Sequence, residues 1–120
     1  MTFPSLRGTL WTLQALQDGD GPSLSQPPGK PAELLLAADQ ERVSGSGGCN
    51  RLLGGFRLSG EQLSFSRLAS TQMACPAAVM AFERRYSEAL GRVRRWSTDK
   101  QTLLLQDERG RTLLVFSAKS

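Results

Sequence analysis

The stretch Val43-Ser-Gly-Ser-Gly-Gly-Cys-Asn-Arg51 places three glycines and two serines directly before a cysteine and an asparagine. Glycine is favoured where the backbone needs a positive φ or must pass close to another group, so the stretch predicts a tight, specifically shaped turn. The other cysteine of the chain lies in a second unusual segment, Ser70-Thr-Gln-Met-Ala-Cys-Pro76. We therefore predict that these two segments meet in space and that the rest of the fold is built around them.

Length and composition indicate one globular domain over residues 1–120. A chain of 120 residues can bury a real core but is too short for two domains. Its 39% hydrophobic and 22% charged residues are typical of a globular protein. No apolar run approaches the roughly 18 residues that cross a bilayer, so we expect no transmembrane segment. The first seven residues lack the basic-then-apolar pattern of a secretory signal.

The absence of histidine excludes several classes of site. Ser-His-Asp and Cys-His catalysis, and zinc or haem held by histidine, all need a residue type that this chain does not contain. Two cysteines alone cannot form a standard structural zinc site, and Cys49 and Cys75 are too far apart for a C-x-x-C redox motif. We therefore predict no enzyme activity, no catalytic residue, no metal and no cofactor.

The net charge of +4 is carried mainly by arginine. Five arginines gather near the predicted end of a helix, at positions 84, 85, 92, 94 and 95. Such a cluster could bind nucleic acid, or it could form a solvated face that complements the helix dipole. Aromatic residues do not alternate with the arginines, as stacking platforms for single strands require, so we expect no nucleic-acid partner.

Most of the chain carries the alternation of apolar and polar residues that predicts β-strands. The expected strands cover residues 8–16, a hairpin at 33–45, then 52–58, 62–66, 92–97, 101–106 and 111–116. Trp11 is expected in the core or at its rim. Gly54-Gly55 predicts a bulge, and Gly110 supplies the positive φ that a hairpin turn at 107–110 needs. Proline and glycine are so dense at residues 17–31 that we expect an exposed loop there.

One helix is expected after Cys75, because Pro76 suits a first helical position and apolar residues then recur at helical spacing. That stripe consists of Val79, Phe82, Tyr86, Ala89, Leu90 and Val93. Glu83 lies at its edge, where a carboxylate is usually half-exposed and hydrogen-bonded to backbone nearby. The fold class that follows is α+β: a mostly antiparallel β-sheet or partly open barrel with one helix packed across it.

The two cysteine segments resemble those of a known family, the META domain, also called the HslJ-like heat-shock domain. The resemblance starts at Gly8-Thr-Leu-Trp-Thr-Leu13 and continues through Gly48-Cys-Asn-Arg51 and Thr71-Gln-Met-Ala-Cys75. It ends with the helix residues Glu83, Tyr86 and Leu90 and the final hairpin. The combination is specific, whereas any single motif would be weak. The residue 17–31 insertion is the main departure from the family pattern, and it leaves the motifs intact.

The resemblance implies a β-rich fold with a helix across it and a role in the cell envelope or in stress responses such as heat shock. Members are often exported or lipid-anchored, and the family has no established catalytic mechanism. The implied location is the periplasm or the outer membrane, with a signal sequence removed and the cytoplasm as the alternative. Some similar structures resemble lipid-binding pilot proteins, which is an analogy of fold alone.

Three interpretations of the motif remain open. In the first, Cys49 and Cys75 form a disulfide, which would stabilise the fold by ~3–4 kcal/mol on the chain-entropy model, while Asn50 and Thr71 bond local backbone. In the second, the thiols are free and Cys75, ahead of a helix, is redox-active. In the third, the turn lines a groove for a peptide, lipid or small ligand, with contacts from Gly45, Gly48, Asn50, Arg51, Thr71, Met73 and Glu83.

From these observations we expect a monomeric accessory binding module whose partner is an unknown protein or an apolar ligand. The alternative is a lipid-carrying, pilot-like module, which would need an apolar cavity between sheet and helix. A thiol-based redox protein is the third and weakest interpretation.

Overall fold

Eight strands and one helix make up the computed structural model, which describes residues 5–17 and 31–118 apart from the side chain of Arg67. Their order is β1 (Leu10–Leu16), β2 (Glu33–Leu36), β3 (Arg42–Ser46), β4 (Arg51–Ser59), β5 (Gln62–Ser70), α1 (Ala77–Arg92), β6 (Arg95–Asp99), β7 (Thr102–Gln106) and β8 (Thr112–Ala118). The loop predicted at residues 17–31 lies almost wholly outside the described residues and stays a prediction.

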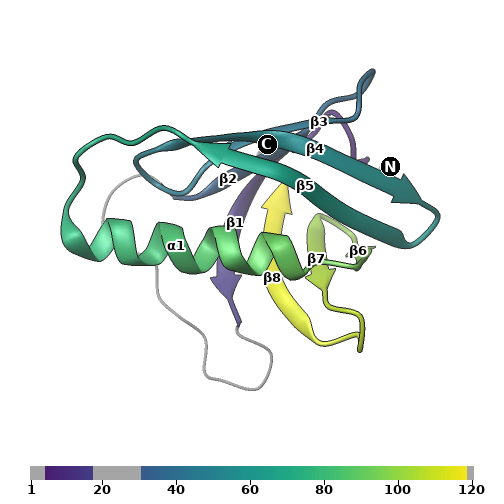
Figure 1. Cartoon of the computed structure of the whole chain (residues 1–120). Coiled ribbons are helices and arrows are strands. Elements are labelled where there is room, and N and C mark those ends of the chain that lie inside the picture. Colours follow the sequence, from purple (N-terminus) through teal and green to yellow (C-terminus); the bar gives the residue numbers. More distant parts are fainter. Residues whose placement is uncertain (1–4, 18–30, 119–120) are drawn as a thin grey trace.

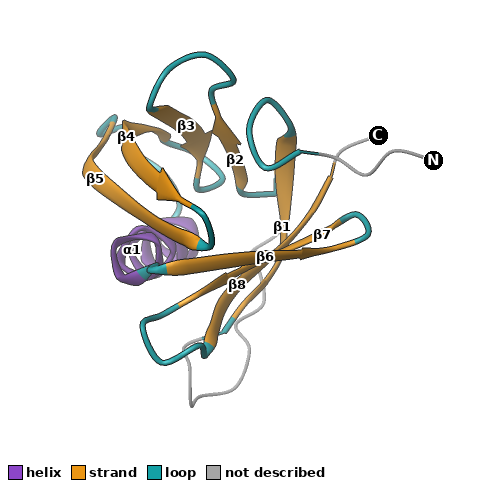
Figure 2. Cartoon of the chain, turned by 90° about the vertical axis from the view of Figure 1, so that its right-hand side faces the viewer, coloured by secondary structure: helices purple, strands orange, loops and turns teal. Residues whose placement is uncertain are grey.

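Each strand pairs antiparallel with the next, and β8 returns to β1, so that the sheet closes into a ring (Figure 1). The ring is weakest between β5 and β6, where the register contains the single pair Gln62 and Arg95. Figure 2 shows α1 lying where these two strands diverge. The α+β class, with a mostly antiparallel sheet and one helix packed across it, is confirmed.

The interior of the ring is filled by side chains. Trp11, Tyr86 and Phe116 are completely buried, and the Tyr86 and Phe116 rings lie 6.3 Å apart between centroids. Trp11 also donates from Nε1 to the carbonyl of Leu6 at 3.0 Å, so the expectation of a core position for Trp11 is confirmed. The other buried hydrophobics include Leu13, Leu16, Leu34, Leu36, Leu63, Leu103, Leu105, Leu113 and Leu114.

The helix forms as its apolar spacing predicts, and it closes the gap in the ring with Phe82, Tyr86, Ala89 and Leu90. Pro76 stands one residue before the first turn, as its N-cap, instead of inside it. The helix is not long and apolar enough to cross a membrane, and no other helix exists in the described residues.

The strand predicted at residues 92–97 is wrong at its beginning. The helix continues through Arg92, and β6 starts only at Arg95. Arg94 explains the boundary, because its Nη1 donates to the carbonyls of Gly91 at 3.1 Å and Val93 at 2.7 Å. This arginine satisfies carbonyls that the helix end leaves without intrahelical partners, as the helix-dipole interpretation of the cluster predicts for Arg94.

The two predicted backbone irregularities are present. At Gly54 the register between β4 and β5 shifts, so that two β5 residues oppose one β4 residue, which is a β-bulge. Gly110 has φ +82° in the turn between β7 and β8. A bulge bends and twists its strand, and this one lies in the part of β5 that runs toward the β5–α1 connection.

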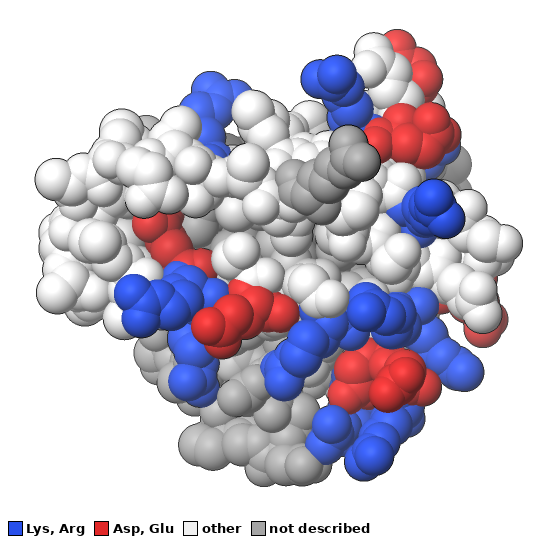
Figure 3. Space-filling model, in the orientation of Figure 1, with Lys and Arg blue, Asp and Glu red and all other residues white. Residues whose placement is uncertain are grey.

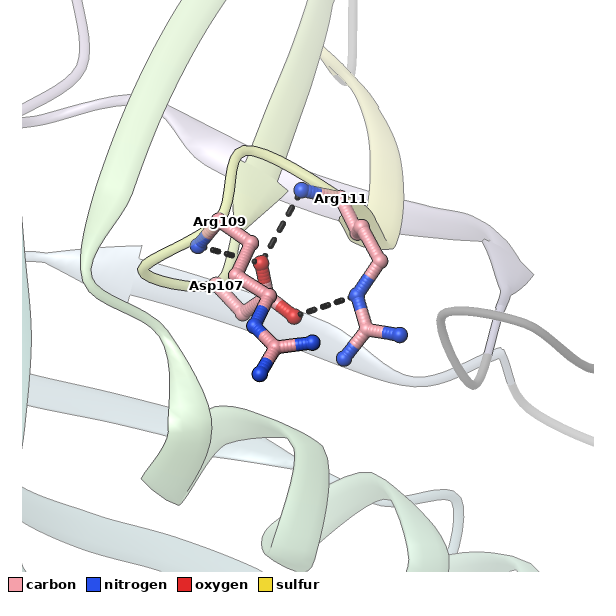
Figure 4. Close-up of polar contacts among 3 residues, drawn as sticks. All are labelled: Asp107, Arg109 and Arg111. Atoms are coloured by element: carbon pink, nitrogen blue, oxygen red, sulfur yellow. Dashed lines mark hydrogen bonds and ion pairs between the residues drawn. The ribbon is translucent and has the colours of Figure 1, made fainter.

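Asp107 organises the turn between β7 and β8 (Figure 4). Its Oδ1 accepts from the backbone N–H groups of Arg109 at 2.9 Å and Arg111 at 3.0 Å, and its Oδ2 accepts from Arg111 Nε at 3.0 Å. Partial desolvation alone would raise the pKa of Asp107, but the hydrogen bonds from Arg111 and Arg109 outweigh it and lower that pKa. The charged carboxylate of Asp107 therefore stabilises this hairpin.

Tyr86 gives a pH-dependent test of the core. It is the chain's only tyrosine, and its hydroxyl donates to the carbonyl of Glu33 at 3.1 Å. Burial, followed by the charge of Glu33, raises the pKa of Tyr86 far above its ordinary value. Above about pH 10 the unfolded chain releases this proton while the folded chain keeps it, so we expect stability to fall as pH rises further.

An alkaline titration followed by tyrosinate absorbance and near-ultraviolet circular dichroism measures this effect. Both signals should change together, in the transition that unfolds the protein. Tyrosinate that forms near pH 10 while the near-ultraviolet spectrum stays native would contradict the buried position of Tyr86.

Candidate functional site

The hairpin between β3 and β4 forms the predicted glycine turn. Gly47 donates its N–H to the carbonyl of Asn50 at 3.3 Å, and Gly48 donates to Ser46 Oγ at 3.0 Å. Gly48 has φ +119°, a conformation that other residues rarely adopt. The turn directs the backbone N–H groups of Cys49 and Asn50 toward α1.

At two further positions glycine is required because other atoms lie close to its backbone, and not because of its φ angle. A Cβ atom on Gly45 would overlap the backbone carbonyl oxygen of Glu33 in the paired strand β2. A Cβ atom on Gly47 would stand 2.7 Å from Cγ of Glu83. The glycine-rich composition therefore lets β2 and the helix both approach the backbone of this hairpin.

Substitution of Gly45 tests this close approach. We expect Gly45→Ala to lower the free energy of unfolding by about 2–3 kcal/mol, because the obstructing atom belongs to the backbone and β2 must move. Gly91→Ala is the matched control: nothing lies within 4 Å of its added Cβ, and alanine favours a helix by about 0.5–1 kcal/mol. Urea unfolding measures both variants. Equal stability of Gly45→Ala and wild type would contradict the packing.

Glu83 is the acceptor at the centre of the site. Its Oε2 accepts from the N–H of Cys49 at 2.9 Å and from the N–H of Asn50 at 2.6 Å. Its Oε1 accepts from Asn50 Nδ2 at 2.9 Å. The half-buried carboxylate thus joins α1 to the turn by three hydrogen bonds, each strengthened by the charge.

Asn50 extends these contacts to the segment after β5. Its Oδ1 accepts from Thr71 Oγ1 at 2.9 Å and from the N–H of Met73 at 2.7 Å. Thr71 Oγ1 accepts in turn from the N–H of Arg51 at 3.0 Å. We call Glu83, Asn50 and Thr71, with the backbone N–H groups that they bind, the Glu83–Asn50 cluster. It joins three segments that are distant in sequence.

The two cysteines meet beside this cluster. Their Sγ atoms lie 2.00 Å apart, at disulfide distance, and their Cα atoms lie 6.5 Å apart. The pair joins the turn to the segment that enters α1, so the prediction that both cysteine segments meet in space is confirmed. No cysteine in the described residues is free, in contrast to the thiol interpretation.

The residues proposed for ligand contact take different places. Gly45, Gly48, Asn50, Thr71 and Glu83 serve the packing and hydrogen bonding described above. The side chains of Arg51 and Met73 are exposed, while their backbone N–H groups belong to the cluster. The structure therefore gathers the predicted set at one end of the molecule but uses most of its polar groups internally.

Sequence reasoning placed Glu83 near backbone but did not identify which backbone. The carboxylate binds N–H groups more than thirty positions earlier in the chain. The contact of Gly47 with Glu83 was also missed. One signal was available: a tight glycine turn leaves N–H groups that need an acceptor, and Glu83 is the acidic residue at the edge of the helix stripe.

A hollow adjoins the cluster between α1 and the end of β5, with a volume of about 290 Å³. Its lining includes the buried residues Leu52 and Tyr86 and the exposed residues Ser70 and Met80. Small-molecule sites usually measure about 300–1,000 Å³, so this hollow is at the lower limit of that range. Elsewhere between sheet and helix, the space is filled by Phe82, Ala89 and Leu90.

A family model described as the META domain matches residues 4–120, almost the whole chain. The chain belongs to the META domain family. The family resemblance that the cysteine segments indicated is thereby confirmed. In this META domain, the motif residues Asn50, Thr71 and Glu83 form the Glu83–Asn50 cluster. No match was found among curated proteins.

Solved structures share the fold of this META domain. The NMR structure of a protein from Burkholderia xenovorans is 32% identical with a TM-score of 0.81, and the match covers 96% of this chain and 84% of that one. A second NMR structure is 23% identical with a TM-score of 0.66, covering 92% and 89%. A DUF4847 family protein from Bacteroides vulgatus is 15% identical with a TM-score of 0.61, covering 93% of each chain, which shows likeness of fold alone.

Proposed function

We propose that this META domain is a non-enzymatic module of the cell envelope that binds another protein through the surface held in place by its motif. One observation supports the proposal most strongly. The disulfide and the Glu83–Asn50 cluster hold the segment between β5 and α1 in place, and the outer side of that segment is uncharged, apolar and exposed. No charged residue occurs from Ser70 to Phe82. We call the exposed apolar part of that segment the uncharged face; it consists of Met73, Ala74, Pro76, Ala77, Ala78, Met80 and Ala81.

The motif itself is better suited to a structural role than to chemistry. Glu83 and Asn50 use their polar atoms on one another, on Thr71 and on the backbone of the turn. A general base or nucleophile would need a polar group directed at a substrate position. This supports a non-enzymatic function in which the motif orders the surface beside it.

The uncharged face has the properties of a protein-binding surface. Met73 is 49% exposed and Met80 is 45% exposed; Leu53 is the one other exposed large hydrophobic among the described residues. Methionine is common on binding surfaces because its flexible side chain adapts to a partner. Figure 3 shows charged groups over the later part of α1 and the strands below it, and few at the end where β5 connects to α1. Such a patch favours contact with an apolar partner surface.

The cysteine pair supports a location in the envelope. Disulfides persist in oxidising compartments such as the periplasm and are rare in the cytosol. A disulfide pair in this domain therefore fits the exported or membrane-associated location that the family resemblance implies. A stress-related role belongs to the same proposal and rests on that resemblance.

Site-specific photo-crosslinking in living cells of the organism that produces this protein tests the proposed function. A photoreactive residue is placed at Met73, at Met80 and, as control, at Lys100, which is exposed in the turn between β6 and β7. We expect discrete crosslinked proteins from the first two positions and none from Lys100. Equal crosslinking at all three positions, or none at Met73 and Met80, would contradict the proposal.

Native mass spectrometry of the purified domain decides between this function and the lipid-carrying alternative. The expected mass is that of the polypeptide with its disulfide. A co-purified lipid would favour the pilot-like module instead. Two free thiols in protein prepared without reductant would favour the thiol-based interpretation.

A further inference from the structure

One face of the sheet carries a group of hydrogen-bond donors where β5 pairs with β4 on one side and with β6 on the other. Arg57 pairs with Ser64, and Ser59 pairs with Gln62, between β4 and β5. Gln62 pairs in turn with Arg95 of β6. Directly paired residues point to the same face of a sheet, as do residues two apart along a strand. The five side chains therefore share one face.

This shared face is the outer one. The alternate positions of the same strands hold Phe56, paired with Phe65, and Leu63, and all three are buried in the core. Arg57 and Arg95, by contrast, are exposed. All five residues of the outer face line a hollow of about 700 Å³, which is within the usual size of a small-molecule site. We call this hollow the arginine hollow.

Arg94 adds a third guanidinium to the lining of the arginine hollow. Its Nη1 donates to the carbonyls of Gly91 and Val93 at the end of α1. A guanidinium carries donors on three nitrogens, so the Nε and Nη2 groups of Arg94 are left for another acceptor. Because the two backbone bonds already hold this side chain in place, it loses less conformational entropy when it binds a ligand.

Positive charge exceeds negative charge in the arginine hollow. Within residues 5–17 and 31–118, neither Arg57 nor Arg95 forms an ion pair. Two carboxylates also line the hollow, those of Glu41 and Glu108. Glu41 is shared with a cation outside the lining, because its Oε1 lies 3.8 Å from Nη1 of Arg7. Three guanidiniums against two carboxylates leave an excess of positive charge, which attracts an anion.

We propose that the arginine hollow binds a phosphate monoester. The guanidiniums of Arg57, Arg94 and Arg95 donate to its oxygens, and the Ser64 hydroxyl and the Gln62 amide donate between them. The strands of Arg57 and Arg95 are separated by β5 and so lie roughly 10 Å apart, a gap that two arginine side chains leaning over β5 span. This site is formed by other residues than the uncharged face, so the inference does not rest on the proposed function.

The number of guanidiniums favours a phosphate over other anions. A carboxylate has two oxygens and fits the fork of one arginine, whereas a phosphate monoester presents three acceptor oxygens in different directions and can engage three arginines. A neutral ligand would leave the excess positive charge of the lining unbalanced. A polyanion such as a nucleic acid would place further phosphates beside Glu41 and Glu108, which repel them. A single phosphate group meets neither difficulty.

Titration of the ¹⁵N-labelled full chain, with its disulfide intact, by glycerol 3-phosphate tests the inference. We expect the amide signals of Gln62, Ser64 and Arg95 to shift together, with one Kd of about 1 mM or lower. Sodium acetate at the same ionic strength should bind more weakly, because it offers two oxygens instead of three.

Three arginine variants locate the binding. Arg57→Gln and Arg95→Gln should each weaken glycerol 3-phosphate binding by about tenfold, because each removes charge-assisted hydrogen bonds. Arg51→Gln is the matched control: this arginine is also exposed on β4 but stands at the other end of the strand and does not line the arginine hollow, so binding should stay unchanged. Circular dichroism verifies that all three variants fold.

Vesicles distinguish two sources of the phosphate monoester. The chain is sedimented with phosphatidylcholine vesicles that contain or lack phosphatidic acid. Sedimentation that needs phosphatidic acid and is lost in Arg95→Gln assigns the site to a lipid headgroup. Binding of glycerol 3-phosphate without sedimentation assigns it to a small soluble phosphate ester.

Three results would overturn the inference: no binding of either probe, equal binding by wild type and both hollow variants, or acetate bound as tightly as glycerol 3-phosphate. None of them bears on the proposed function, which the crosslinks from Met73 and Met80 test separately.

Discussion

Replacement of Glu83 by alanine should lower the free energy of unfolding of this META domain by about 3–4 kcal/mol. The carboxylate accepts from the N–H groups of Cys49 and Asn50 and from Asn50 Nδ2. The variant leaves these half-buried donors without their charged acceptor, which costs more than the loss of an ordinary hydrogen bond. Urea unfolding monitored by tryptophan fluorescence measures the difference.

Two matched variants isolate the role of the carboxylate. Glu83→Gln keeps one acceptor oxygen but sets an amide donor against Asn50 Nδ2, so we expect an intermediate loss of about 1–2 kcal/mol. Glu88→Ala removes an exposed carboxylate from the next part of α1 and should change stability by less than about 0.5 kcal/mol. If Glu83→Ala resembled Glu88→Ala, the contacts of Glu83 would not hold the turn.

Removal of the disulfide should have an effect of similar size. The double variant Cys49→Ala with Cys75→Ala opens a link across 26 positions of sequence, and we expect a loss of about 3–4 kcal/mol on the chain-entropy model. The Glu83–Asn50 cluster still joins the same segments in that variant. We therefore expect the folded state to persist with a near-native amide spectrum.

Reduction with a dithiol provides the corresponding test without mutation. Reduced wild type should unfold at nearly the same urea concentration as the double variant, while reductant should not change the variant itself. A loss below about 1 kcal/mol, or two free thiols in protein prepared without reductant, would show that the cysteine pair does not stabilise the domain.

The sequence allowed prediction of much of the fold because its signals are local. Period-2 alternation indicated most strands, and the spacing of Phe82, Tyr86 and Leu90 indicated the helix. Gly110 marked its turn correctly. The boundary at Arg92 was missed because the arginines there fit both a helix end and a strand. The extended backbone of Val93 and the contact of Arg94 with the last carbonyls mark the helix end in the structure.

The sequence allowed us to predict that two segments meet at the site, but not which hydrogen bonds join them. Two cysteines in unusual contexts indicated the contact between residues 43–51 and 70–76. The bonds of Glu83 depend on how the helix crosses the open side of the ring, which local patterns do not specify. A groove beside the turn was one of the open interpretations, and Asn50, Thr71 and Glu83 of that set line the hollow; its helix side was not predicted, because it depends on where α1 lies against the sheet.

These observations assign most of the family motif to structure, and we propose that binding occurs on the surface beside it. Gly45 and Gly47 allow the close approaches, and Gly48 supplies the positive φ of the turn. Glu83 and Asn50 connect the segments, and the cysteine pair links the same region covalently. Because these groups hold the β5–α1 connection, their loss should weaken partner binding only indirectly, through the order of the uncharged face.

A double-mutant cycle on Asn50 and Glu83 tests this structural role most directly. The free energies of unfolding of wild type, Asn50→Ala, Glu83→Ala and the double variant are measured by urea unfolding under one set of conditions. We predict that the double variant loses about 1–2 kcal/mol less than the sum of the single losses, since the two side chains act in one cluster. Single losses that add to within about 0.3–0.5 kcal/mol would contradict the account.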